Sequence, residues 1–134
     1  MLETGNQTTY TWQRVVSETP SGQAGYAVYS DCKLGDDVTA DEFYDAYVAY
    51  AKAAKDKGDV AGRKMIFPQQ GVPSTWDYDF VQLVSTETIT DYGKNWTNFW
   101  SSATPESMPE LKALQDLGGS CENERTYGIV PVRN

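Results

Sequence analysis

The sequence predicts an α+β fold in which an antiparallel sheet carries its helices on one face and gains an extra N-terminal strand. Three observations lead to this prediction: the order of strand-like and helix-like segments, the placement of the two cysteines, and strands that are apolar on both faces. With 134 residues, the chain is long enough for one domain with its own core.

The N-terminal part of the chain predicts two strands separated by a turn. Residues 8–16 (TTYTWQRVV) alternate and are rich in β-branched and aromatic side chains, which is typical of a strand. Residues 18–23 have turn composition, and residues 25–33 (GYAVYSDCK) form the second predicted strand. We therefore divide the chain into an N-terminal strand and turn extension, residues 1–24, and a main α+β domain, residues 25–134.

The best-defined element is a helix predicted over residues 40–57. Thr39 can cap its first turn, and Glu42 can return the hydrogen bond in a capping box. Val38 and Phe43 occupy the two positions of a hydrophobic staple. Apolar and aromatic side chains then recur at helical spacing, at Phe43, Tyr47, Tyr50 and Ala54, which supports the helix.

Two further strands and a second helix are predicted next. Residues 63–68 (RKMIFP) indicate a short strand and residues 76–85 (WDYDFVQLVS) a longer one, with a loop between them. Along the longer strand, alternation places Trp76 and Tyr78 on the same face. Residues 87–100 predict a helix because their large apolar side chains keep helical spacing.

Two last elements complete the predicted order. Thr104-Pro105-Glu106 predicts the start of a third, shorter helix with proline at its first position, and Gly118-Gly119 predicts its end. Residues 125–132 (RTYGIVPV) predict the final strand. Without the N-terminal strand, the order is β-α-β-β-α-β with one additional helix, which is the split order of the ferredoxin-like fold.

The two cysteines fit this topology. Its last strand lies antiparallel beside its first, so the end of the strand at residues 25–33 meets the start of the final strand. Cys32 and Cys121 lie at those two places, and we predict a disulfide between them, with two free thiols as the alternative. A disulfide would close a loop of about 90 residues, would stabilise the fold by roughly 4–5 kcal/mol and would favour an extracytoplasmic location. Free thiols would favour the cytoplasm.

The strands carry apolar side chains on both faces. Met65 and Phe67 alternate with Ile66, and Phe80 points away from Val81. The predicted helices can cover only one face, whereas strands that are apolar on both faces are normally covered on both. The other face must contact either the N-terminal strand region or another subunit, and we expect a homodimer that packs sheet against sheet.

The element order, the helix DEFYDAYVAYAKAAKDKG and the segment WDYDFVQLVSTETITDYGKNW resemble the dimeric α+β-barrel group. That group includes antibiotic-biosynthesis-monooxygenase-like and NIPSNAP-like domains, and the resemblance covers roughly residues 25–132. It implies a ferredoxin-like subunit in a dimeric barrel. Haem-binding members use a helical histidine, whereas cofactor-free oxygenases of the group use pocket Asn, Trp, Tyr or Asp residues. Residues of such types on the predicted second helix are Asn95, Trp96, Asn98 and Trp100.

Composition excludes several functions. The net charge of −8 and the pI near 4.4 argue against nucleic acid, whose phosphates require clustered Lys and Arg. No apolar run approaches the roughly 20 residues of a membrane span. The first residues lack the regions of a signal peptide, although a Met1 that replaced a removed one would leave the same sequence.

The chain contains no histidine, which limits the chemistry available to it. Ser-His-Asp and Cys-His nucleophiles, haem with a proximal histidine and nearly all catalytic zinc sites require this residue. Acid–base chemistry would depend on carboxylates, Tyr or Lys with shifted pKa values. No pattern in the sequence identifies catalytic residues.

Two aromatic segments are candidates for ligand binding. Trp76 could stack on a flat ligand while Tyr78 donates a hydrogen bond, or both could belong to the core. On the second helix, Trp96 and Trp100 could line a pocket between helices and sheet, with Asn95 and Asn98 as polar contacts. A simple core stripe is the alternative for these residues.

Metal and phosphate sites are not expected. The acidic residues at 36–37 and 41–42 do not have EF-hand spacing, and a helix N-terminus already explains them. Gly118-Gly119-Ser120 follows a helix rather than opening one, so it does not form a phosphate loop. No cofactor is expected.

The leading hypothesis is a homodimeric α+β-barrel domain that binds a small apolar or aromatic molecule, with a cofactor-free reaction as an option. The alternative is a non-catalytic homodimeric structural or interaction module whose aromatic residues serve only the core and the dimer face. A cavity lined by Trp96, Trp100 and Tyr78 would favour the first, and a completely filled core would favour the second.

Overall fold

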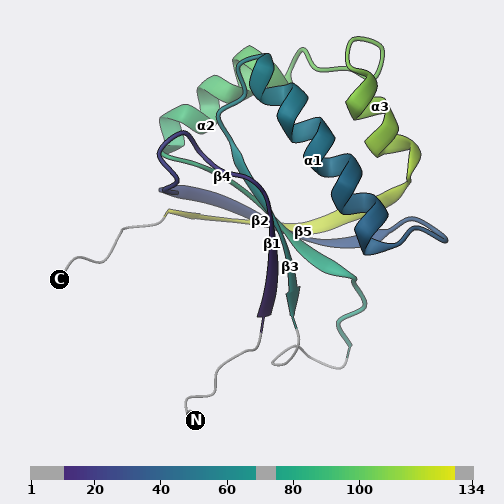
Figure 1. The fold of residues 1–134 in the computed structure, drawn as a ribbon. Helices are drawn as coiled ribbons and strands as arrows, with labels where there is room; N and C mark the ends of the chain where they lie inside the picture. The colour runs from purple at the N-terminus through teal and green to yellow at the C-terminus, as the bar shows by residue number, and fades with distance from the viewer. Residues whose placement is uncertain (1–10, 69–74, 129–134) are drawn as a thin grey trace, which may run out of the picture.

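The computed structural model describes residues 11–68 and 75–128, which form a sheet with helices packed on one side of it (Figure 1). In chain order, the elements are β1 (Thr11–Ser17), β2 (Tyr26–Leu34), α1 (Ala40–Asp56), β3 (Gly62–Pro68), β4 (Phe80–Thr86), α2 (Ile89–Asn95), the π-helical turn η1 (Trp96–Trp100), α3 (Pro109–Asp116) and β5 (Gly119–Gly128). This is the α+β class that the sequence predicts.

The strands form one open antiparallel sheet in the order β1-β3-β4-β2-β5. Without β1, the order β5-β2-β4-β3 is consistent with a ferredoxin-like type of fold. β1 comes from the predicted N-terminal extension and joins the same sheet beside β3, with Val15 opposite Lys64. The antiparallel sheet with helices on one face is therefore confirmed (Figure 1).

The core lies between the sheet and the helices. Strand alternation points every second side chain toward the helices, and these side chains include Cys32, Met65 and Phe80, each at most 1% exposed. Tyr47 and Ala51 of α1 pack against them from the helical side. Large buried aromatic and apolar side chains of this kind supply most of the stability of such a fold.

Helix α1 begins and ends as the sequence predicts. The Thr39 hydroxyl accepts a hydrogen bond from the Glu42 amide at 3.1 Å, and the Thr39 amide donates to the Glu42 carboxylate at 3.0 Å. This capping box satisfies two amide groups that the first turn would otherwise leave without partners. At the other end, Gly58 has a φ of 100°, which stops the helix.

The predicted disulfide is confirmed. Cys32 and Cys121 lie directly opposite one another on β2 and β5, and their sulfur atoms are bonded. Cys32 is buried in the core, whereas Cys121 lies on the exposed edge strand. The bond therefore ties the edge strand to the interior of the sheet across a sequence separation of 89 residues.

Strand β4 starts later than predicted. The sequence predicts a strand from Trp76, but β4 begins at Phe80. The Asp79 carboxylate accepts a hydrogen bond from the Leu34 amide at 2.7 Å, and the Asp79 amide donates to the Cys32 carbonyl at 2.8 Å. These two bonds pair the backbone groups at the end of β2 with Asp79, and the residues before Asp79 do not continue the strand. The prediction that Trp76 and Tyr78 share a strand face is therefore wrong.

The last helix and the last strand also differ from their predicted bounds. Thr104 and Ser107 close a separate turn by accepting each other's amide hydrogen bonds, so Pro109 rather than Pro105 takes the first helical position. β5 begins at Gly119 rather than at residue 125, because Gly118 and Gly119 have φ angles of 76° and 99° that turn the chain directly into the sheet. Residues 8–10 and 129–132 of the predicted strands lie outside the described residues.

Candidate ligand-binding pocket

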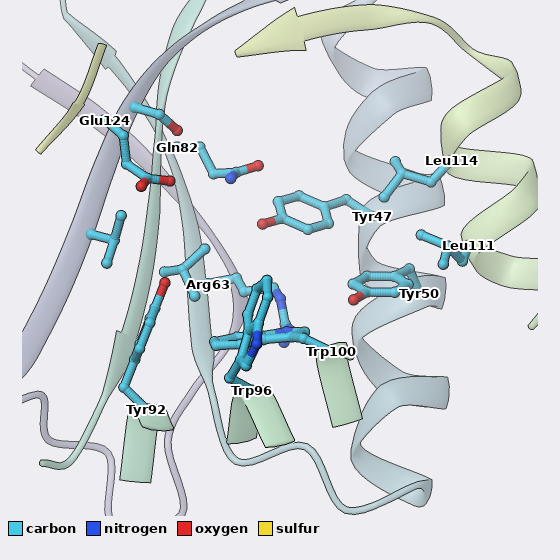
Figure 2. Close-up of a pocket in the computed structure, with 13 residues that line it drawn as sticks. Tyr47, Tyr50, Arg63, Gln82, Tyr92, Trp96, Trp100, Leu111, Leu114 and Glu124 are labelled. Carbon is cyan, nitrogen blue, oxygen red and sulfur yellow. The ribbon is translucent and has the colours of Figure 1, made fainter. Parts of the chain in front are cut away.

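A cavity of about 380 Å³ lies between the sheet and the helices (Figure 2). Its size falls within the range of small-molecule sites in proteins. The side chains that line it come from four strands and from the helical layer: Val28, Ser30, Tyr47, Tyr50, Arg63, Gln82, Val84, Tyr92, Trp96, Trp100, Leu111, Leu114 and Glu124. Most of these groups are aromatic or apolar, and the polar atoms are few and separate.

One wall of the cavity is formed by α2 and η1. Tyr92, Trp96 and Trp100 follow one another at intervals of four residues and therefore lie on one helical face. The ring centroids of Tyr92 and Trp100 are 4.9 Å apart at 62°, and those of Trp96 and Trp100 are 6.1 Å apart at 64°. Trp96 is 59% exposed and stands at the rim of the cavity.

The end of this wall is a π-helical turn. The Ser101 amide donates to the Trp96 carbonyl at 2.9 Å, five residues back along the chain. Such turns are rare, and those that occur are often located at functional sites. Here the turn directs Phe99 into the core, where it is 3% exposed, while Trp96 and Trp100 line the cavity.

The opposite wall is formed by α1. The rings of Tyr47 and Tyr50 are stacked with centroids 6.3 Å apart and planes at 21°. Figure 2 shows the Tyr47 hydroxyl pointing from α1 into the cavity, toward Gln82 of β4. Burial raises the pKa of both phenols above the ordinary value. Both therefore stay neutral at physiological pH and can donate hydrogen bonds to a ligand.

A buried ion pair lies beneath the cavity. The two terminal nitrogens of Arg63 donate to the two carboxylate oxygens of Asp59 at 2.7 and 3.0 Å, and these side chains are 2% and 0% exposed. Asn95 donates to Asp59 at 2.8 Å and accepts from the Val60 amide at 3.0 Å. Burial lowers the pKa of Arg63, but the hydrogen bonds and charge of Asp59 raise it more, so the guanidinium stays charged.

The structure divides the six predicted ligand-binding residues between several places. Trp96 and Trp100 line the cavity. Asn95 is buried below it and holds Asp59 instead of facing a ligand. Asn98 is exposed and lies outside the lining. The other two residues, Trp76 and Tyr78, belong to a different region.

Trp76 and Tyr78 lie beside the opposite face of the sheet. Their ring centroids are 5.5 Å apart, and the Tyr78 hydroxyl accepts a hydrogen bond from Asn123 of β5 at 3.1 Å. Asn123 also donates to Asp31, which points away from the helices because its neighbour Cys32 points toward them. The cavity and the Trp76–Tyr78 pair are therefore on different faces.

Several lining residues were not predicted from the sequence. The sequence places Tyr47 and Tyr50 only in the series at helical spacing on α1, although phenols in such a series indicate a position between apolar and polar surroundings. Arg63 shares the inward face of β3 with Met65 and Phe67, because every second residue points the same way. A cation at an inward strand position indicates a buried partner. No pattern in the sequence indicates that Glu124 lines a cavity.

Within residues 11–68 and 75–128, no group of Cys, Asp and Glu side chains could hold a metal ion. Among the helices described for this chain, none is both long enough and apolar enough to cross a membrane. Comparisons with protein-family models, with curated proteins and with solved structures found no match. The geometry of the cavity is therefore the basis for the functional argument.

Proposed function

We propose that this chain is a homodimeric α+β-barrel domain that binds a small aromatic or apolar molecule in the cavity between sheet and helices. The observation that carries the proposal is the cavity of about 380 Å³ walled by Trp96, Trp100 and Tyr47. Protein cores are normally packed with few voids larger than a water molecule, so a core alone does not need such a space. A bound ligand would remove the apolar walls of the cavity from water.

The proposal is for binding rather than for acid–base catalysis. An efficient general acid or base has a pKa near the working pH. The pKa values of Tyr47, Tyr50 and Tyr92 are all raised above the ordinary value, chiefly by burial, and so move away from neutrality. These phenols are better suited to fixing a ligand by hydrogen bonds than to moving protons.

The dimer part of the proposal rests on the sheet face opposite the helices. Val15 and Tyr127 on this face are 44% and 52% exposed, and Tyr29, Ile66 and Val81 are partly exposed. Apolar strand faces of this kind are usually covered. A second copy of the sheet would cover the exposed side chains and leave the cavity, on the helical side, accessible.

The binding proposal can be tested with Trp96→Leu. Because Trp96 is 59% exposed, its truncation is expected to leave the fold intact while weakening the binding of one-ring aromatic fragments, measured by calorimetric titration. The matched control is Trp12→Leu, since Trp12 is 55% exposed on β1 and does not line the cavity. Equal affinity in both variants would contradict the proposed site, and unfolding of Trp96→Leu would assign this residue to the core.

The dimer can be tested separately by size-exclusion chromatography with light scattering, which gives the molar mass of the protein in solution. The native chain is expected to have the mass of a dimer, and Val15→Glu is expected to shift it toward the monomer by placing a charge in the interface. Ile89→Glu is the control because Ile89 is 65% exposed on α2, in the helical layer. A monomeric native protein would refute the dimer without affecting the binding proposal.

A further inference from the structure

The charges of the cavity do not balance. Two lining side chains carry a full charge, Arg63 and Glu124. Arg63 is paired through both terminal nitrogens with Asp59, so its charge already has a counter-charge. Glu124 forms no ion pair with any residue of the two described ranges. Among the residues that the structure describes, Glu124 therefore gives the lining one negative charge without an ion-pair partner.

Glu124 is placed to act on a ligand in the cavity. It extends from β5 at the exposed edge of the sheet, and Figure 2 shows its carboxylate on the cavity side, across from Tyr47. Its charge also raises the pKa of the Tyr92 phenol, after the larger effect of burial. The carboxylate is therefore electrostatically coupled to the aromatic wall.

The aromatic walls add to this negative potential. Each ring carries partial negative charge on its face, and a cation over such a face is attracted to it. Tyr92, Trp96 and Trp100 are tilted by 62° and 64° to one another, so the wall presents ring faces in different directions. Tyr47 provides one more ring on the opposite side, whereas the Arg63 guanidinium already lies over the neighbouring Tyr50 ring, 5.2 Å from its centroid. Four aromatic side chains and one carboxylate therefore surround the space that a ligand cation would occupy.

We propose that the cavity selects an organic cation, namely an amine or quaternary ammonium group attached to an apolar or aromatic body. This inference rests on the proposed function and names the ligand class of that site. The cationic group lies among the rings within reach of the Glu124 carboxylate, and the apolar body contacts Leu111 and Leu114 of α3. A ligand carboxylate is disfavoured because it would face Glu124 while Arg63 is already paired.

The test compares three one-ring probes by isothermal titration calorimetry: benzyltrimethylammonium, benzyl alcohol and benzoate. We expect the cation to bind at least about tenfold more tightly than benzyl alcohol, and benzoate to bind most weakly. Glu124→Gln is expected to weaken binding of the cation by about tenfold and to leave the affinity for benzyl alcohol unchanged. Glu124 is exposed, so this variant is expected to fold normally.

The matched control is Glu122→Gln, which makes the same charge change two residues away on the same strand. The pairing of β5 with β2 shifts register between Tyr29 and Asp31, so Glu122 and Glu124 lie on different faces although they are two residues apart. Glu122 pairs with Asp31 and lies near Tyr78, away from the cavity, and its replacement is expected to have no effect on the cation. If benzyl alcohol binds as tightly as the cation, or if both variants weaken the cation equally, the inference is wrong while the binding proposal stands. If none of the three probes binds the native protein, both are overturned.

Discussion

Removal of the Asp59 charge, with Arg63 left in place, is expected to destabilise the protein strongly. Asp59 accepts two hydrogen bonds from Arg63 and one from Asn95, and the two charged side chains are 0% and 2% exposed. In Asp59→Asn the guanidinium would stay buried without a counter-charge. Breaking one side of a buried ion pair in this way costs about 3–5 kcal/mol.

This loss can be measured by urea unfolding followed by tryptophan fluorescence and by thermal unfolding. For a chain of 134 residues, it corresponds to a decrease in Tm of about 10–18 °C. Arg63→Met in the Asp59→Asn background removes both charges, and it is expected to recover most of the lost stability because an apolar replacement of a buried pair is often neutral.

The exposed pair between Lys112 and Asp116 of α3 is the control. It has the same spacing of four residues and the same shortest distance of 2.7 Å as the buried pair, but its side chains are 62% and 63% exposed. Asp116→Asn is expected to cost less than about 1 kcal/mol because water and salt screen such pairs. If Asp59→Asn costs no more than Asp116→Asn, the assignment of a desolvated ion pair beneath the cavity is wrong.

Three further predictions concern other parts of the fold. Replacing both Cys32 and Cys121 by Ser is expected to lower the free energy of unfolding by roughly 4–5 kcal/mol, and urea unfolding of this variant should no longer respond to reductant. Burial raises the pKa of Asp31, but hydrogen bonds from Arg125 and Asn123 lower it more, to a net value below its usual 3.8. Its stabilising effect is therefore present above the unfolded pKa and lost as the pH falls through the folded pKa, so Asp31→Asn should flatten the acid limb of stability measured against pH. Thr39→Ala is expected to cost about 1 kcal/mol, seen as a lower Tm in circular dichroism, because the α1 cap is lost.

The parts of the fold that follow from local chemistry or from topology could be predicted from the sequence. The capping box at Thr39 and Glu42 is a local pattern with one structural meaning, and α1 begins where it predicts. The contact between Cys32 and Cys121 follows from the order of the strands once these are recognised. The start of β4 could not be predicted, because the bond from Leu34 to the Asp79 side chain depends on where β2 ends.

Only part of the cavity could be anticipated. Helical spacing predicts that Trp96 and Trp100 share a face, and both side chains line the cavity in the π-helical turn. The sequence does not show whether Tyr47 fills the core or lines a cavity. Its hydroxyl lies in a cavity only because α1 and the sheet are far enough apart to leave one, and sequence spacing does not give that distance. Glu124 lies two residues from Glu122, so regular alternation would put both on one face. The register shift between β5 and β2 puts them on different faces, with Glu124 toward the cavity. Sequence order alone does not contain that choice.

The π-helical turn gives this segment one residue more than an α-helical turn of similar rotation would contain. Each residue in an α-helix turns the chain by about 100°. Loss of one residue between Trp96 and Phe99 would convert the turn into α-helix, so Phe99 and Trp100 would keep nearly the same orientation toward the core and the cavity. Addition of one residue has no such compensation and would rotate the chain after it by about 100°. Single-residue deletions should therefore be tolerated here more readily than single-residue insertions.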